Sequence, residues 1–98
     1  MTLTSKQRAY LKGLASVEDA LFQIGKAGIT PQVTQSVTEL FSTHELIKGT
    51  VLKSCTEDLR EIAARLSERT RSVPVQVIGR KIVLYKPFAK DPEIQLPE

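Results

Sequence analysis

The sequence predicts a mixed α/β fold in which three helices and four strands follow one another in the order α-β-α-β-α-β-β. Hydrophobic patterns with helical and with extended spacing alternate along most of the chain, which gives two strand–helix–strand units. Two further extended segments meet at Gly79-Arg80, a pair typical of a hairpin turn. The strand–helix–strand units imply parallel pairs with right-handed crossovers, and the hairpin adds an antiparallel pair. We therefore expect a two-layer sandwich with a mixed four-stranded sheet.

The first helix is expected to begin after Thr4 and to run to about Ala15. Thr4 and Gln7 have the spacing of a capping box, in which two side chains satisfy free amides at a helix start. The apolar stripe of this helix is Tyr10, Leu11 and Leu14, and the other side carries Lys6, Arg8 and Lys12. The pattern predicts a half-buried helix with a basic outer side.

A strand over residues 20–24, a glycine turn over residues 25–28 and a second helix from residue 31 are predicted next. The strand segment is short and apolar, and Thr30 and Pro31 suit the N-cap and the first position of a helix. The helix should end near Thr43 or His44. Its apolar residues recur at amphipathic spacing and are Val33, Val37, Leu40 and Phe41.

Residues 46–53 predict the second strand, inside which Gly49 indicates a bulge or a close approach of another group. Thr56 is the expected N-cap of a third helix. The apolar stripe of that helix is Leu59, Ile62, Ala63 and Leu66. Arginines and glutamates alternate on its outer side, and we expect surface ion pairs among Arg60, Arg65, Arg69, Glu57, Glu61 and Glu68.

The last two strands are expected over residues 73–78 and 82–85. Gly79 stands first in the turn between them, as a type II′ hairpin requires. Pro74 cannot donate a hydrogen bond to a neighbouring strand, so it should lie at the strand's start or on a sheet edge. Val73, Val75 and Val77 alternate with other residues. This alternation predicts that one face of the sheet is more apolar than the other.

A chain of 98 residues has room for one hydrophobic core, and its composition of 41% hydrophobic and 26% charged residues is typical of a folded domain. We expect a single domain over residues 1–88 and an extended, loosely held acidic tail over residues 89–98.

The chain has no bilayer-length apolar segment and no signal-peptide pattern, and Cys55 has no partner for a disulfide. We therefore expect a cytoplasmic protein, and a monomer.

The charge of the chain is unevenly distributed. The net charge is +3, but the first 90 residues carry all 14 basic side chains, whereas Asp91, Glu93 and Glu98 crowd into the tail. An excess of positive charge over the folded part favours a polyanionic partner such as a nucleic acid.

The loop Gly25-Lys26-Ala27-Gly28 is the most informative local feature. Glycines let a phosphate approach main-chain amides, the positive end of a helix follows, and Lys26 adds a charge. An ordinary turn is the alternative interpretation of this short pattern. A KH domain is disfavoured because its glycine loop joins two helices, and dinucleotide binding is disfavoured because Thr30 replaces the third glycine.

The residue types of a catalytic or metal centre are not grouped in a way that indicates an enzyme. His44 and Cys55 are predicted at opposite ends of the second strand, too far apart to act as base and nucleophile. No metal-ligand cluster or cofactor motif stands out, and we expect no cofactor and no small-molecule substrate. Tyr10, Phe22 and Phe41 lie in predicted core stripes, so base stacking on an open sheet is not expected.

Several blocks of the sequence, in order, resemble the YhbY-type bacterial CRM domain, named for chloroplast RNA splicing and ribosome maturation. The matching segments span nearly the whole chain and are residues 6–7, 11–15, 24–28, 44–48, 75–79 and 83–87. The resemblance implies a fold akin to the C-terminal domain of the third bacterial initiation factor. It also implies binding to ribosomal RNA or to precursors of the large ribosomal subunit.

The family's glycine-x-x-glycine loop carries over to Gly25, Lys26, Ala27 and Gly28, and its basic surface to Lys6, Arg8, Lys12 and Lys48. We add Arg80 and Lys81 at the hairpin as candidate RNA-binding residues, because they extend the basic rim. The family often has a valine and a basic residue where this chain has Gly49-Thr50, so the chain departs from the family's pattern within the second strand. The alternative function is a protein–protein adaptor in a ribosome-associated complex, without direct RNA contact.

Overall fold

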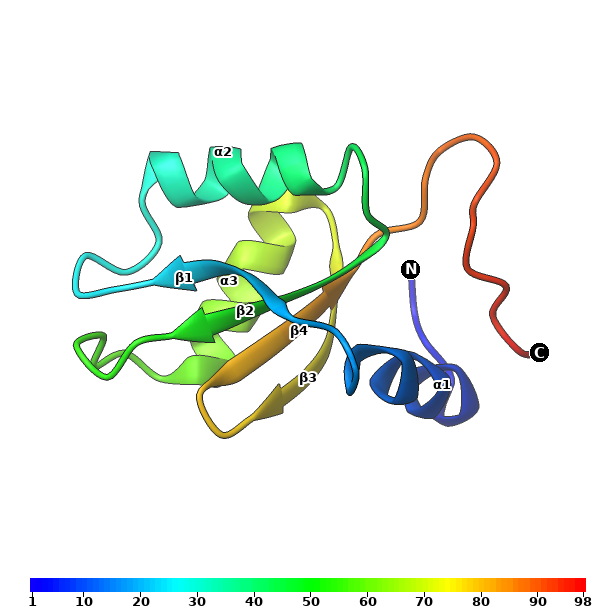
Figure 1. Ribbon diagram of the computed structural model, residues 1–98, viewed down its shortest axis with the longest axis horizontal. Helices are drawn as coiled ribbons and strands as arrows, with labels where there is room; N and C mark the ends of the chain where they lie inside the picture. Colours follow the sequence, from blue (N-terminus) through cyan, green and yellow to red (C-terminus); the bar gives the residue numbers. More distant parts are fainter.

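The computed structural model describes residues 1–98 and has the seven elements in the predicted order (Figure 1). The elements are α1 Ser5–Ala15, β1 Ala20–Ile24, α2 Pro31–Leu40, β2 Leu46–Val51, α3 Leu59–Thr70, β3 Val73–Ile78 and β4 Lys81–Tyr85. The mixed α/β fold class is thereby confirmed. None of the helices combines the length and the apolar character that crossing a membrane requires.

The four strands form one mixed sheet in the order β1-β2-β4-β3. β1 pairs with β2 in parallel, and β4 pairs antiparallel with both β2 and β3. The expectation of two parallel pairs is therefore wrong for the second unit. β2 and β3 run in the same direction, but the returning hairpin strand β4 lies between them. β1 and β3 become the two edges of the sheet.

The main hydrophobic core lies between one face of the sheet and the helices α2 and α3. Alternate residues of the central strands point into it, among them Ile47, Val51, Ile82 and Leu84. The predicted stripes of α2 and α3 also pack here, since Val37, Phe41, Ile62 and Leu66 are buried. This sheet and the two helices on it make up the two layers expected from the sequence.

Helix α1 packs on the opposite face of the sheet, near the β3 edge, and forms a second cluster there (Figure 1). Leu11 and Ala15 contribute from the helix, and Val83 and Tyr85 contribute from β4. The prediction that Tyr10 belongs to the buried stripe is wrong, because its side chain is 43% exposed. α1 meets the sheet through a narrow stripe centred on Leu11, which leaves Tyr10 on its flank.

Two of the three predicted helix starts are confirmed. Thr4 and Gln7 form the complete capping box, and Thr30 accepts a hydrogen bond from the Val33 amide. α3, however, begins after Asp58, whose carboxylate accepts from the amides of Arg60 and Glu61, and not after Thr56. The chain before Asp58 is held in a turn in which the Cys55 amide donates to the Leu52 carbonyl, so the helix starts two residues later.

Strand β3 is an irregular edge strand. Pro74 lies near its start, as expected, and the register with β4 shifts between Pro74 and Gln76. Val73 and Val75 consequently pack in the second cluster, whereas Val77 packs against the main core. The simple alternation predicted for the three valines is interrupted by this bulge.

The last ten residues have no regular structure but lie against the body of the protein. The buried carboxylate of Glu45 accepts hydrogen bonds from the amides of Phe88, Glu93 and Ile94, at 2.7, 2.9 and 2.7 Å. Ile94 and Leu96 pack against the second cluster. The tail is therefore anchored to the body of the protein, in contrast to the loosely held segment expected from the sequence.

Candidate functional site

Three connections meet at one end of the sheet (Figure 1). They are the loop after β1, the segment between β2 and α3, and the hairpin turn between β3 and β4. Because β1 and β2 are parallel and β4 runs antiparallel to β2, the ends of β1 and β2 and the start of β4 coincide. This arrangement brings the predicted residues Lys26, Arg80 and Lys81 to the same end of the molecule, which we call the loop end.

The loop Gly25–Gly28 is a tight turn closed by a hydrogen bond of 2.9 Å from the Gly28 amide to the Gly25 carbonyl. Gly28 has a φ of +69°, a conformation that favours glycine. Lys26 and Ala27 at the tip are exposed, and their amides donate no hydrogen bond within the chain. The turn leads directly to the positive N-terminus of α2. Its tip therefore offers two free N–H groups and one lysine to an anion.

One acidic side chain limits where such an anion can lie. A Cβ added to Gly28 would overlap Oε2 of Glu57, so this carboxylate stands directly against the second glycine. Glu57 also forms the chain's one ion pair, with Arg65 of α3. The Gly28 side of the loop is consequently closed to phosphate, and the open side is the one formed by Lys26 and Ala27. No sequence pattern indicated this contact, because residues 28 and 57 meet only through the fold.

Arg80 has a structural role at the loop end. Its guanidinium donates to the carbonyls of Val51 at 2.8 Å, of Leu52 and of Cys55 at 3.0 Å. These bonds fasten the β3–β4 turn to the segment after β2. The guanidinium is therefore largely engaged, in contrast to the free cation that the sequence suggested.

Lys81 and Lys48 lie on the sheet face that carries α1, in the part that the helix leaves open. Lys81 pairs with Thr50 across β4 and β2, and its Nζ donates to Thr50 Oγ1 at 2.6 Å. Lys48 stands two residues before Thr50 and thus on the same face. Both lysines have access to solvent, so they extend the positive charge from the loop end along the sheet.

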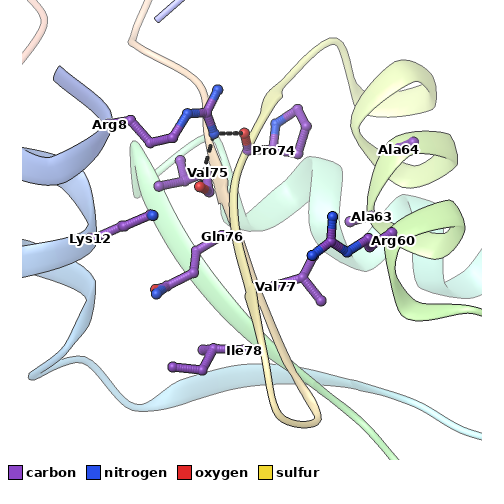
Figure 2. A pocket seen from close by; sticks show the side chains of 10 residues that line it. All are labelled: Arg8, Lys12, Arg60, Ala63, Ala64, Pro74, Val75, Gln76, Val77 and Ile78. Atoms are coloured by element: carbon purple, nitrogen blue, oxygen red, sulfur yellow. Dashed lines mark hydrogen bonds between the residues drawn. The ribbon is translucent and has the colours of Figure 1, made fainter. Parts of the chain in front are cut away.

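The three predicted basic residues of α1 form a second group. Arg8 donates through Nη1 to the carbonyls of Pro74 at 2.7 Å and Val75 at 2.8 Å, which ties α1 to the bulge of β3. Lys12 lies one turn further along and points toward β3 (Figure 2). Lys6 is exposed near the start of the helix. The candidate residues are therefore divided between the loop end, the open sheet face and α1.

A groove of about 510 Å³ runs along the free edge of β3, between α1 and α3 (Figure 2). Arg8 and Lys12 line it from α1, and Arg60 lines it from α3. The expectation that Arg60 and Arg69 form ion pairs on α3 is wrong, because Arg65–Glu57 is the one pair found. Sequence reasoning missed Arg60 because its spacing of three residues from Glu57 suits a salt bridge that the side chains do not make.

The two residues considered for catalysis do not meet. Cys55 is buried after β2, whereas His44 is exposed before β2, with its Nδ1 at 2.8 Å from Thr43 Oγ1. The length of β2 separates them, as predicted.

Comparisons with known proteins agree over almost the full length of the chain. The sequence profile of the CRS1/YhbY (CRM) domain family matches residues 3–86. The chain is 39% identical over 95 residues to the "Probable RNA-binding protein YqeI" of Bacillus subtilis, covering 97% of this chain and 99% of that protein. It is 35% identical over 96 residues to a Haemophilus influenzae protein named "RNA-binding protein", covering 98% and 96% of the two chains.

A solved structure shows the same fold. The solution structure of a Staphylococcus aureus protein, described as hypothetical and as a candidate RNA binder, matches with a TM-score of 0.84. The two sequences are 45% identical, and the match covers 98% of this chain and 100% of the other.

Proposed function

The chain belongs to the CRS1/YhbY (CRM) domain family, and from this premise we propose that it binds RNA through the Gly25–Gly28 loop and the neighbouring basic side chains. The names of its relatives in Bacillus subtilis and Haemophilus influenzae support an RNA partner. We further propose that the RNA is ribosomal, within precursors of the large subunit, and that the protein acts in the cytoplasm as a monomer without catalysing a reaction.

The observation that carries this proposal is the free tip of the glycine turn. The amides of Lys26 and Ala27 donate no hydrogen bond within the chain, both residues are exposed, and Lys81 lies at the same end of the sheet. Main-chain amides and lysines hold phosphate oxygens without distinguishing one base from another. The site is therefore suited to the sugar–phosphate backbone of a structured RNA.

Recognition by shape and charge also fits the positions of the aromatic residues. Phe22 and Phe41 are buried in the main core, so the open sheet face has no aromatic platform of the kind that stacks bases. Tyr10 is the most exposed aromatic side chain, and it lies on α1. We expect at most one stacked base there, next to a larger number of phosphate contacts.

A sedimentation experiment separates RNA binding from the adaptor alternative. Tagged protein is followed through sucrose gradients of cell extract, with and without mild ribonuclease treatment. We expect it to sediment with large-subunit precursors and to be released by ribonuclease, whereas an adaptor would keep its protein partners. Lys26→Glu should shift the protein to the top of the gradient. Lys90→Glu makes the same charge change on the exposed tail and should leave sedimentation unaltered.

Sedimentation that persists after complete RNA digestion would contradict direct RNA binding. Equal behaviour of the Lys26 and Lys90 variants would remove the glycine turn from the site while leaving RNA binding in place. Recovery in mature subunits alone would contradict the assignment to precursors.

A further inference from the structure

The groove at the β3 edge is separate from the glycine turn. β3 and β1 are the opposite edges of the sheet, and the turn follows β1. We propose that this groove is a second contact for the phosphate backbone of the bound RNA, with Arg60 as its central side chain; this inference rests on the RNA-binding function proposed above. The RNA then crosses the molecule from one sheet edge to the other.

The shape of the groove follows from the bulge in β3 and from small side chains on α3. Ala63 and Ala64 line the side formed by α3, where they leave room that longer residues would fill. On the other side, Arg8 holds α1 against the bulge through its bonds to Pro74 and Val75. The space is therefore fixed by packing on both sides and does not depend on a mobile loop.

The charge of the groove has one sign. Its lining includes Arg8, Lys12 and Arg60 and contains no aspartate or glutamate (Figure 2). The Arg60 guanidinium and the Lys12 amine make no hydrogen bond and no ion pair within the chain. Arg8 uses only Nη1, so Nη2 and Nε remain free for a further acceptor. Three cations that face one concave surface from two helices suit consecutive phosphates.

The free edge of β3 is poorly suited to the other obvious occupant, an added peptide strand. Pro74 has no N–H group, the register shifts beside it, and Arg8 already occupies the carbonyls of Pro74 and Val75. Proline, bulges and covering charges are devices that block strand addition. Only residues 76–78 keep a regular edge, which is the lower limit of the usual strand length. The phosphate backbone remains the partner that the groove fits.

The test compares two arginines of α3 that are both exposed and unpaired. Arg60 lines the groove, and Arg69 lies in the last turn of the same helix and does not line it. Binding of a labelled fragment of large-subunit ribosomal RNA is measured at several salt concentrations. Arg60→Ala should weaken binding roughly three- to tenfold and lower the salt slope by about 0.7, as expected for one lost phosphate contact. Arg69→Ala should change neither value.

Amide signals report the contact directly. When the same RNA is added to 15N-labelled protein, we expect shifts at Gln76 and Val77 in the groove together with shifts at Lys26 and Ala27. Shifts at the glycine turn alone, or equal affinities of the two arginine variants, would overturn the groove as an RNA contact and leave the proposed function intact. Such a result would also be expected if an acidic peptide occupied the groove. Absence of RNA binding by the unmodified protein would overturn both proposals.

Discussion

The ring of Phe22 lies against Gly49 on the neighbouring parallel strand, so closely that a Cβ added to Gly49 would overlap the ring atoms Cζ, Cε1 and Cε2. Both residues belong to the face of the main core, and Phe22 is largely buried there. The ring occupies the space that a side chain at position 49 would need. This contact gives a physical reason for the glycine at position 49: the large residue stands on β1 and the small one on β2.

We expect Gly49→Ala to destabilise the protein by about 1–3 kcal/mol, because the added methyl group overpacks a core position that has no free space. Urea denaturation followed by circular dichroism measures the change. Gly13→Ala is the control, since a Cβ at Gly13 of α1 meets nothing within 4 Å. Alanine there should stabilise the helix by about 0.5–1 kcal/mol. A Gly49→Ala variant as stable as the parent protein would show that the ring moves aside freely.

Arg80 should matter for stability more than for RNA binding. Its three carbonyl acceptors are arranged for a planar guanidinium, and a lysine could reach only one of them well. We expect Arg80→Lys to cost about 1–2 kcal/mol of unfolding free energy. Lys81→Ala, at the next position, should leave stability almost unchanged and weaken RNA binding. The reverse pattern in paired denaturation and binding measurements would contradict the roles assigned to these neighbours.

We expect the protein to lose stability at alkaline pH because of the phenol of Tyr85. Burial, and secondly the negative charge of Glu45, raise the pKa of Tyr85 above its ordinary value of 10.0. The folded protein holds the phenol proton more tightly than the unfolded chain does. Its contribution to stability is therefore complete below pH 10.0 and is lost as the pH rises through the raised pKa.

Ultraviolet titration of the phenolate in a Tyr10→Phe background, in which Tyr85 is the one remaining tyrosine, measures this pKa. Glu45→Gln should move it part of the way back, because the charge is removed while burial remains. Tyr85→Phe should abolish this component of the alkaline destabilisation. A Tyr85 phenol that titrates at or below 10.0 would refute the effect.

Local sequence rules were sufficient for most of the elements. The caps at Thr4 and Thr30, the hairpin at Gly79 and the edge position of Pro74 each depend on residues close together in the chain, and all four are confirmed. The sequence predicts the start of α3 two residues too early, because Thr56 and Asp58 are both residue types that cap helices well. The choice between them depends on the turn at Leu52–Cys55, to which the distant Arg80 is bonded.

The parts of the candidate site that local patterns could not predict involve contacts between distant elements. The insertion of β4 between β2 and β3 decides which strand has a free edge, and no hydrophobic pattern specifies that order. Arg60 has the helical spacing of an ion-paired residue and instead faces the groove. The same limit applies to Glu57, whose position against Gly28 depends on how two loops meet.

The salt dependence of RNA binding tests the central claim most directly. With about four phosphate contacts, each adding about 0.7 to the slope of log affinity against log salt concentration, affinity should fall roughly 50-fold between about 50 and 200 mM salt. Lys26→Gln should lower the slope by about 0.7, while Lys90→Gln should not change it. An affinity for ribosomal RNA that hardly varies with salt, or a slope that is the same for the parent protein and Lys26→Gln, would contradict a phosphate contact at the glycine turn.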